Sequence, residues 1–326
     1  MDSGIKERCD LMIENRRRLQ DIFAYGNKKI VFSAAAIISS YGIPADKKKI
    51  IFCKNLLKKR IDILSGLRGQ MYPVLVIKMA LSSDPEDYLR RVKKIYSILR
   101  TRIGSGYDYS ALASIILCDK TSEEYYERVA ARTIEIYNAM KNKHFIITSY
   151  EDIPFCVLLS FLNISTPEII QETEKNYNLL KNFFLDSNAV QSLSHILTFD
   201  RNQAESKCTR VRGILNELNK MHHKYGKSYE LPMLGLIASI QLPNEILAGM
   251  IAETENYLAL QKGFNNLGIT SKTLLMFAAM VIVQQFNCTN SDITGVHVNS
   301  VLSGTDAADI AAVLCCISSC TNDCVV

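Results

Sequence analysis

Apolar positions along this chain recur with helical spacing, and no stretch alternates apolar and polar residues as a half-buried strand does. Two kinds of segment alternate. Short segments of about eleven residues carry almost no charge and should be buried; LRGQMYPVLVI at 67–77 is one of them. Longer segments, such as YLRRVKKIYSILRTR at 88–102, place charged and apolar residues on opposite faces and should cover the short ones. The pattern predicts an all-α chain.

This pair of segments repeats. Six short segments align, and their first residues are 38, 43, 38, 41 and 41 residues apart: Leu67, Ser105, Thr148, Asp186, Lys227 and Gly268. Four tyrosines of the long segments follow the same interval: Tyr96, Tyr137, Tyr177 and Tyr257. A period of about 40 residues in an all-α chain is typical of stacked helical hairpins. We therefore expect an array of about six to seven α-α hairpin repeats, either an open solenoid or a closed α/α toroid.

No shift in composition marks a second domain, so we expect a single helical-repeat domain over 1–326. It comprises basic N-terminal helices at 1–66, regular repeats at 67–286, and a C-terminal loop with a small-residue helix at 287–326. Three turns have the spacing of a capping box, in which a hydroxyl and a Glu three residues later satisfy free N–H groups at a helix start. The pairs are Ser83 with Glu86, Thr121 with Glu124, and Ser165 with Glu168.

Charge is unevenly distributed. Residues 1–104 contain 22 Lys and Arg against 10 Asp and Glu, a net +12, whereas residues 105–326 contain 16 against 23, a net −7. The most basic segment is KKKIIFCKNLLKKR at 47–60. A solvated basic face is its plain interpretation, and contact with nucleic acid or an anionic membrane is the functional one. The basic end would also suit an acidic partner or a second copy of the chain.

The sequence favours a cytoplasmic protein. Its start, MDSGIKERCDLMIENRRR, has no apolar segment that would direct export, so the 10 cysteines are expected to be reduced. No apolar stretch reaches the roughly 20 residues of a transmembrane helix. Cys316, Cys320 and Cys324 fall on one helical face. We expect these small apolar side chains to pack against the fold, and a site for a soft metal ion is the alternative. Metal-binding, phosphate-binding and nucleophile-elbow motifs are absent, and we expect no cofactor.

Candidate chemistry gathers in the loops that enter the short helices, which an array of repeats would place along one edge. Tyrosines and carboxylates recur there and would suit a polar ligand. The alternative is that the carboxylates only stabilise helix N-termini. The candidate ligand-binding residues are Arg68, Tyr107, His144, Tyr150, Asn188, Gln191 and Tyr229, with the acidic candidates Asp108, Glu151 and Asp152.

Two histidines need separate interpretation. His195 falls on an otherwise uncharged short helix, either as a hydrogen-bonded core residue or as an acid/base group. His144 follows Lys143 at a loop entrance, where positive charge can close a helix C-terminus. His222 and His223 lie in the Lys-rich end of a long helix and are expected at the surface.

Two stretches resemble a known family. KNKHFIITSYEDIPFCVLLSF at 141–161 and SNAVQSLSHILTF at 187–199 are similar to signature stretches of an uncharacterised, mostly Gram-positive bacterial family, catalogued as domain of unknown function four thousand and three. The second stretch matches closely from Asn188 to His195. In the first, the family has Asn-His-Pro-Phe where this chain has Lys143 to Ile146, so the proline is lost. The resemblance covers the whole chain and implies no known activity, but it favours a site around His144, Glu151, Asp152, Gln191 and His195.

Three functional hypotheses follow. The leading one is a non-catalytic helical-repeat binding or scaffold protein that holds a protein or a small polar ligand at the edge formed by its loops. The alternative is a helical-toroid enzyme that acts on a small polar substrate, with His195 as acid/base and Asp108, Glu151 or Asp152 as its carboxylate partner. A third is an accessory protein that docks its basic end on nucleic acid or an anionic membrane.

Overall fold

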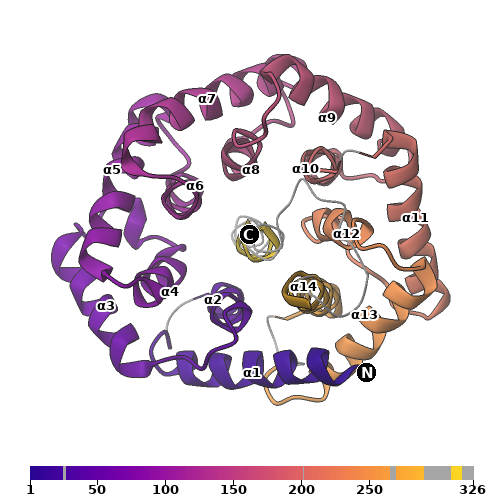
Figure 1. The fold of residues 1–326 in the computed structure, drawn as a ribbon, viewed down its shortest axis with the longest axis horizontal. Helices are drawn as coiled ribbons and strands as arrows, with labels where there is room; N and C mark the ends of the chain where they lie inside the picture. The colour runs from indigo at the N-terminus through magenta and orange to yellow at the C-terminus, as the bar shows by residue number, and fades with distance from the viewer. Residues whose placement is uncertain (25–26, 201, 265–268, 290–309, 318–326) are drawn as a thin grey trace. The chain divides into compact units, whose positions relative to one another are not determined.

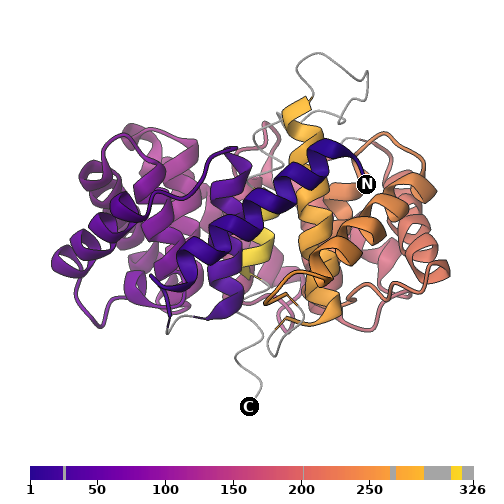
Figure 2. The same cartoon turned by 90° about the horizontal axis from the view of Figure 1, so that it is seen from below.

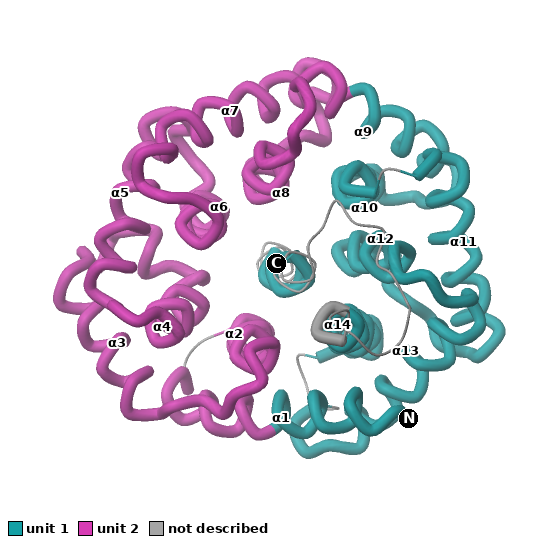
Figure 3. The backbone as a smooth tube through the Cα atoms, in the orientation of Figure 1, with its two compact units in different colours: residues 1–13, 171–318 teal, residues 14–170, 319–326 magenta. Residues whose placement is uncertain are grey.

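A computed structural model describes residues 1–24, 27–200, 202–264, 269–289 and 310–317 (Figure 1). Helices follow one another through these ranges, and none of the described residues forms a β-strand. The all-α prediction is therefore confirmed. The chain divides into two compact units, one of residues 1–13 with 171–318 and one of residues 14–170 with 319–326 (Figure 3). We refer to them as the 171–318 unit and the 14–170 unit.

In the 14–170 unit, nearly uncharged helices form a buried layer under amphipathic ones. The buried helices α4 and α8 are apolar on almost every side, and α2 packs on α4 and α6 on α8. Helices α3, α5 and α7 cover α4, α6 and α8. The helices are α1 (Ser3–Gln20, shared with the other unit), α2 (Lys28–Ser40), α3 (Lys47–Arg60), α4 (Tyr72–Leu81), α5 (Pro85–Ile103), α6 (Tyr107–Lys120), α7 (Tyr126–Lys143), α8 (Ile153–Leu159) and α9 (Thr166–Leu180, also shared), with the 3₁₀ turns η1 (Gly66–Arg68), η2 (Glu123–Tyr125) and η3 (Tyr150–Asp152).

The 171–318 unit uses the same two layers. Its buried helices are α10 (Ser187–Leu197), α12 (Leu231–Ala238) and α14 (Ser271–Thr289), and α12 packs on both of the others. Helices α11 (Ala204–Lys220) and α13 (Asn244–Ala259) cover them. Residues 310–317 are helical (Figure 2) and buried. Cys315 Sγ lies 3.4 Å from Met280 Sδ on α14.

A recurring contact ties a helix to the following turn in both units. The last carbonyls of a helix lack partners within it, and a cation placed there satisfies them. Five helices, α1, α3, α5, α7 and α11, supply such a cation, and we call these contacts cation clamps. Arg18 donates to the carbonyl of Ala45 at 3.0 Å, Lys49 to Ser82 at 2.9 Å, Arg91 to Cys118 at 3.4 Å, Arg132 to Leu162 at 2.9 Å and to Ile164, and Arg210 to Ala238 at 2.7 Å and to Ile240 and Leu242.

Of the three expected capping boxes, one is confirmed and two are wrong. Ser165 and Glu168 satisfy each other's backbone N–H groups at the start of α9. Asp84 caps α5 instead of Ser83, because its carboxylate, one residue nearer the helix, accepts two N–H groups. Thr121 closes the C-terminus of α6, and a 3₁₀ turn from Glu123 separates it from α7.

Candidate functional site

Three loops of the 14–170 unit lie side by side, and glycines allow their close approach. A Cβ on Gly66 would lie 2.7 Å from Cβ of Tyr107, and a Cβ on Gly106 would lie 2.5 Å from Cβ of Tyr150. Both distances are too short for a real side chain. The loops that precede α4, α6 and α8 therefore form one continuous surface, which we call the loop edge: residues 61–71, 104–108 and 144–152. Seven of the predicted site residues fall on it: Arg68, Tyr107, Asp108, His144, Tyr150, Glu151 and Asp152.

The acidic residues of the loop edge hold the backbone in place. Asp108 accepts the N–H of Gln70 at 2.7 Å and also that of Met71, so it joins the start of α6 to the loop before α4. Asp152 accepts the N–H of Ser149 at 2.8 Å and completes a capping box. Burial raises the pKa of Asp108, and it raises the pKa of Asp152 to about 7. These contacts match the interpretation of the carboxylates as helix-start groups.

The side chains that the loop edge exposes are mainly apolar and aromatic. Leu64 is 91% exposed, Phe145 76% and Ile146 93%. Tyr107 and Tyr150 are also exposed. Cations lie over two of the rings: the Arg100 guanidinium is 4.0 Å from the Tyr107 ring centre, and the Lys141 ammonium is 5.7 Å from that of Phe145. Large exposed apolar groups gathered in this way are typical of interaction sites.

The remaining candidates lie in the 171–318 unit. Asn188 is exposed in the first turn of α10, and Tyr229 is half-buried before α12. Gln191 and His195 are buried within α10, and His195 has no exposed surface. Asp186 was not among the predicted site residues. Its carboxylate caps α10 and accepts the Ser228 hydroxyl at 2.5 Å, so the loops before α10 and α12 are joined as well.

The four candidate catalytic residues are divided between the units. Asp108, Glu151 and Asp152 belong to the 14–170 unit, and His195 belongs to the other. Among the described residues, neither unit by itself assembles a His–carboxylate pair from these four. His144 lies at the C-terminus of α7, where its backbone N–H bonds to Met140, as its sequence position suggested.

His223 was expected at the surface of a long helix, and this is wrong. Helix α11 ends at Lys220, and the backbone turns at His222, which has a φ of 63°. The His223 side chain is only 17% exposed, and its Nδ1 lies 3.4 Å from the carboxylate of Glu255 on α13. Nothing local in the sequence signals this pair, because its members are far apart in the chain.

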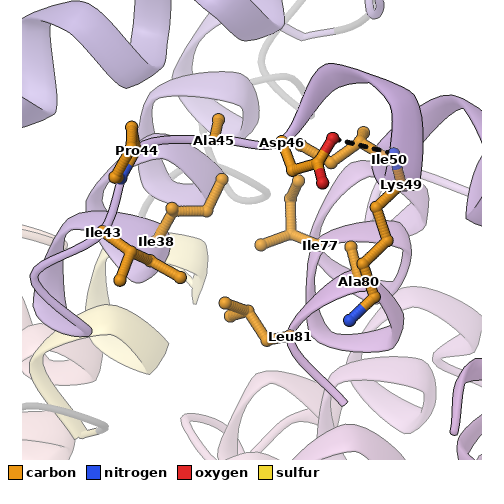
Figure 4. Close-up of a pocket in the computed structure, with 10 residues that line it drawn as sticks. All are labelled: Ile38, Ile43, Pro44, Ala45, Asp46, Lys49, Ile50, Ile77, Ala80 and Leu81. Carbon is orange, nitrogen blue, oxygen red and sulfur yellow. Dashed lines mark hydrogen bonds between the residues drawn. The ribbon is translucent and has the colours of Figure 1, made fainter. Parts of the chain in front are cut away.

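A pocket of about 260 Å³ opens in the 14–170 unit at the C-terminal ends of α2 and α4 (Figure 4). The loop edge lies instead at the N-terminal ends of α4, α6 and α8. Apolar side chains such as Ile38, Ile77 and Leu81 line it. Its two charged residues are engaged elsewhere, since Asp46 caps α3 and the Lys49 ammonium donates to the Ser82 carbonyl. The pocket can therefore accommodate an apolar group but offers little to orient a polar one.

Within the described ranges, no three His, Cys, Asp or Glu side chains gather closely enough to hold a metal ion. Cys315 and Cys316 are buried, and burial raises the pKa of Cys315. Cys320 and Cys324, expected on the same helical face as Cys316, lie outside the described residues. None of the described helices is both long and apolar enough to cross a bilayer.

Comparison with known proteins gives one match. No curated protein and no solved structure is detectably similar to this chain. A family model described as "Protein of unknown function (DUF4003)" matches residues 17–308, which is most of the chain and includes both stretches on which the sequence resemblance rested. The chain therefore belongs to the DUF4003 family.

Proposed function

We propose that this chain is a non-catalytic helical-repeat scaffold whose loop edge binds a protein partner. One observation carries the proposal: the adjoining loops of the loop edge expose large apolar side chains, while the carboxylates of Asp108 and Asp152 are bonded to the backbone. An acid/base site needs ionisable groups that can reach a substrate. Asp108 instead joins two adjoining loops, and Asp152 holds the start of its own helical turn.

The composition of the loop edge favours a protein over a small polar ligand. Tyr, Phe and Arg are enriched where protein partners bind, and a few aromatic or Arg anchors supply most of the binding energy. Arg100 and Lys141 sit over aromatic rings at this edge, and Arg68 and Lys143 add positive charge. The expected partner is a protein segment with apolar side chains flanked by acidic ones.

The scaffold itself is proposed to be an array of α-α hairpins. Support comes from the cation clamps, in which successive covering helices contact the following turn in the same way. An open solenoid and a closed toroid of such hairpins differ in radius of gyration. Small-angle X-ray scattering of the full chain would distinguish them.

Site-specific photo-crosslinking in the cells that make the protein tests the binding role. A photoreactive amino acid would replace Tyr107 or Ile146 on the loop edge, and Leu260, which is 83% exposed in the other unit, as the control. We expect the same partner protein to be captured at Tyr107 and Ile146, and not at Leu260. Capture of nothing at the loop edge, or of the same proteins at all three positions, would contradict the proposal.

A further inference from the structure

Helix α3 differs from the other covering helices in its charge. Its sequence, KKKIIFCKNLLKKR, contains seven basic residues and no acidic one. Ile50, Cys53, Leu56 and Leu57 form its buried side, which packs on α4. Helix α3 therefore needs no further contact to complete the fold, and its opposite side is available to a partner.

The opposite side combines lysines with large apolar side chains. We call it the α3 face: Lys47, Lys48, Ile51, Phe52, Asn55, Lys58 and Lys59, all of them exposed. Ile51 and Phe52 are 46% and 55% exposed. In a helix that packs on one side only, apolar residues are expected on the packed side, whereas these two lie on the opposite side. With about 100° between successive residues, the members of this face share one stripe along roughly 18 Å of helix.

The lysines of the α3 face are poorly neutralised. Lys47 lies 3.4 Å from Asp21, and both side chains are exposed, so that pair contributes little. Lys48, Lys58 and Lys59 form no ion pair within the part of the chain that the structure describes. Among the described residues, three of the four lysines beside the exposed apolar groups therefore have no acidic side chain paired with them.

This combination fits an anionic lipid surface better than the other basic-face partners. Only one exposed side chain of the α3 face, Phe52, has a ring on which a nucleic-acid base could stack, whereas nucleic-acid grooves use several. Phosphate recognition favours Arg, which on α3 occurs only at position 60 beside Glu86. Protein interfaces are depleted in Lys. Amphipathic helices that lie in the bilayer interface instead carry lysines around Phe, Leu or Ile side chains that insert below the headgroups.

We propose that the α3 face docks on an anionic lipid bilayer, with α3 lying in the plane of the membrane. Ile51 and Phe52 enter the boundary between headgroups and acyl chains. Lys47, Lys48, Lys58 and Lys59 contact the anionic headgroups. The C-terminal end of the α3 face adjoins the loop edge, because α3 ends at Arg60 and the loop edge begins at residue 61.

Vesicle co-sedimentation of the full chain tests this, with phosphatidylcholine vesicles that contain or lack phosphatidylglycerol. Each basic residue near an anionic surface strengthens binding by a factor of about five. We therefore expect Lys58→Glu/Lys59→Glu to weaken binding to phosphatidylglycerol vesicles at least tenfold. Lys224→Glu/Lys262→Glu makes the same change of net charge at exposed positions that do not belong to the α3 face, and it should weaken binding less than about twofold.

A second pair of variants separates lipid insertion from simple charge attraction. Ile51→Ser/Phe52→Ser should weaken vesicle binding at least fivefold because it removes the inserted apolar groups, whereas Leu260→Ser should not change it. Equal binding to vesicles with and without phosphatidylglycerol would overturn the proposal. So would tighter binding to single-stranded RNA that depends on the lysines but not on Ile51 and Phe52, since that result assigns the α3 face to nucleic acid.

Discussion

The cation clamp of Arg132 allows a quantitative test of how the hairpins are held together. Arg132 on α7 donates to the carbonyls of Leu162, at 2.9 Å, and Ile164, in the turn between α8 and α9. Replacing it with Met removes both bonds but keeps an unbranched apolar side chain along the helix. The two carbonyls then lose a charged donor in a partly buried turn.

The magnitude follows from these two bonds. A hydrogen bond to a charged group contributes about 1.5–3 kcal/mol, and two bonds from the same guanidinium nitrogen are not fully additive. We expect Arg132→Met to lower the free energy of unfolding by about 2–4 kcal/mol. Urea unfolding followed by circular dichroism would measure this difference, with the slope against urea compared between proteins to check that the same surface unfolds.

Arg128 supplies the matched control for this measurement. It lies one turn earlier on α7, is exposed, and makes no ion pair or hydrogen bond with the described residues. Arg128→Met should change stability by less than about 0.5 kcal/mol. Equal effects of the two substitutions, or an Arg132→Met effect below about 0.5 kcal/mol, would refute the view that the cation clamps stabilise the fold.

Further predictions concern the loop edge and the buried titratable groups. Gly66→Ala should destabilise the protein by about 1–3 kcal/mol because its Cβ would overlap that of Tyr107, whereas Gly249→Ala, in α13 with nothing within 4 Å, should stabilise it by up to about 1 kcal/mol; thermal unfolding of the two variants compares them. Asp152 has a folded-state pKa of about 7, above the unfolded value of about 3.9. Its contribution to the free energy of unfolding is therefore fully present below about pH 4 and is lost as pH rises through about 7. Asp152→Asn should remove that decline, and unchanged pH dependence of urea unfolding in the variant would contradict the assignment. The buried thiols of Cys9, Cys118 and Cys208, whose pKa values burial raises, should resist alkylation until the protein unfolds, which peptide mapping by mass spectrometry can follow.

The all-α fold and its buried helices were predictable because helical spacing and low charge are local properties of the sequence. Segments such as 67–77 contain too few polar groups to be anything but buried, and α4 is indeed enclosed. The capping positions were less predictable. Ser83 and Asp84 are adjacent and both suit a helix start, and only the backbone geometry decides between them.

The contacts that organise the site could not be predicted, because each depends on residues distant in sequence. Arg128 and Arg132 look alike in the helical pattern, yet only Arg132 faces the following turn. Asp108 was recognised as a helix-start residue, but its bond to Gln70 requires the neighbouring loop to be in place. The exposed Phe145 and Ile146 were noted only as a departure from the family pattern. Their exposure became evident from the loop geometry.

Native mass spectrometry of the protein purified gently from the cells that make it tests the central claim most directly. The wild-type chain would be compared with Phe145→Ser/Ile146→Ser, which removes two apolar side chains of the loop edge, and with Leu260→Ser as the control. We predict a second protein chain bound to the wild type and to Leu260→Ser, and its loss from the double variant. A bound small molecule retained by all three proteins, with no second chain in any of them, would contradict the account.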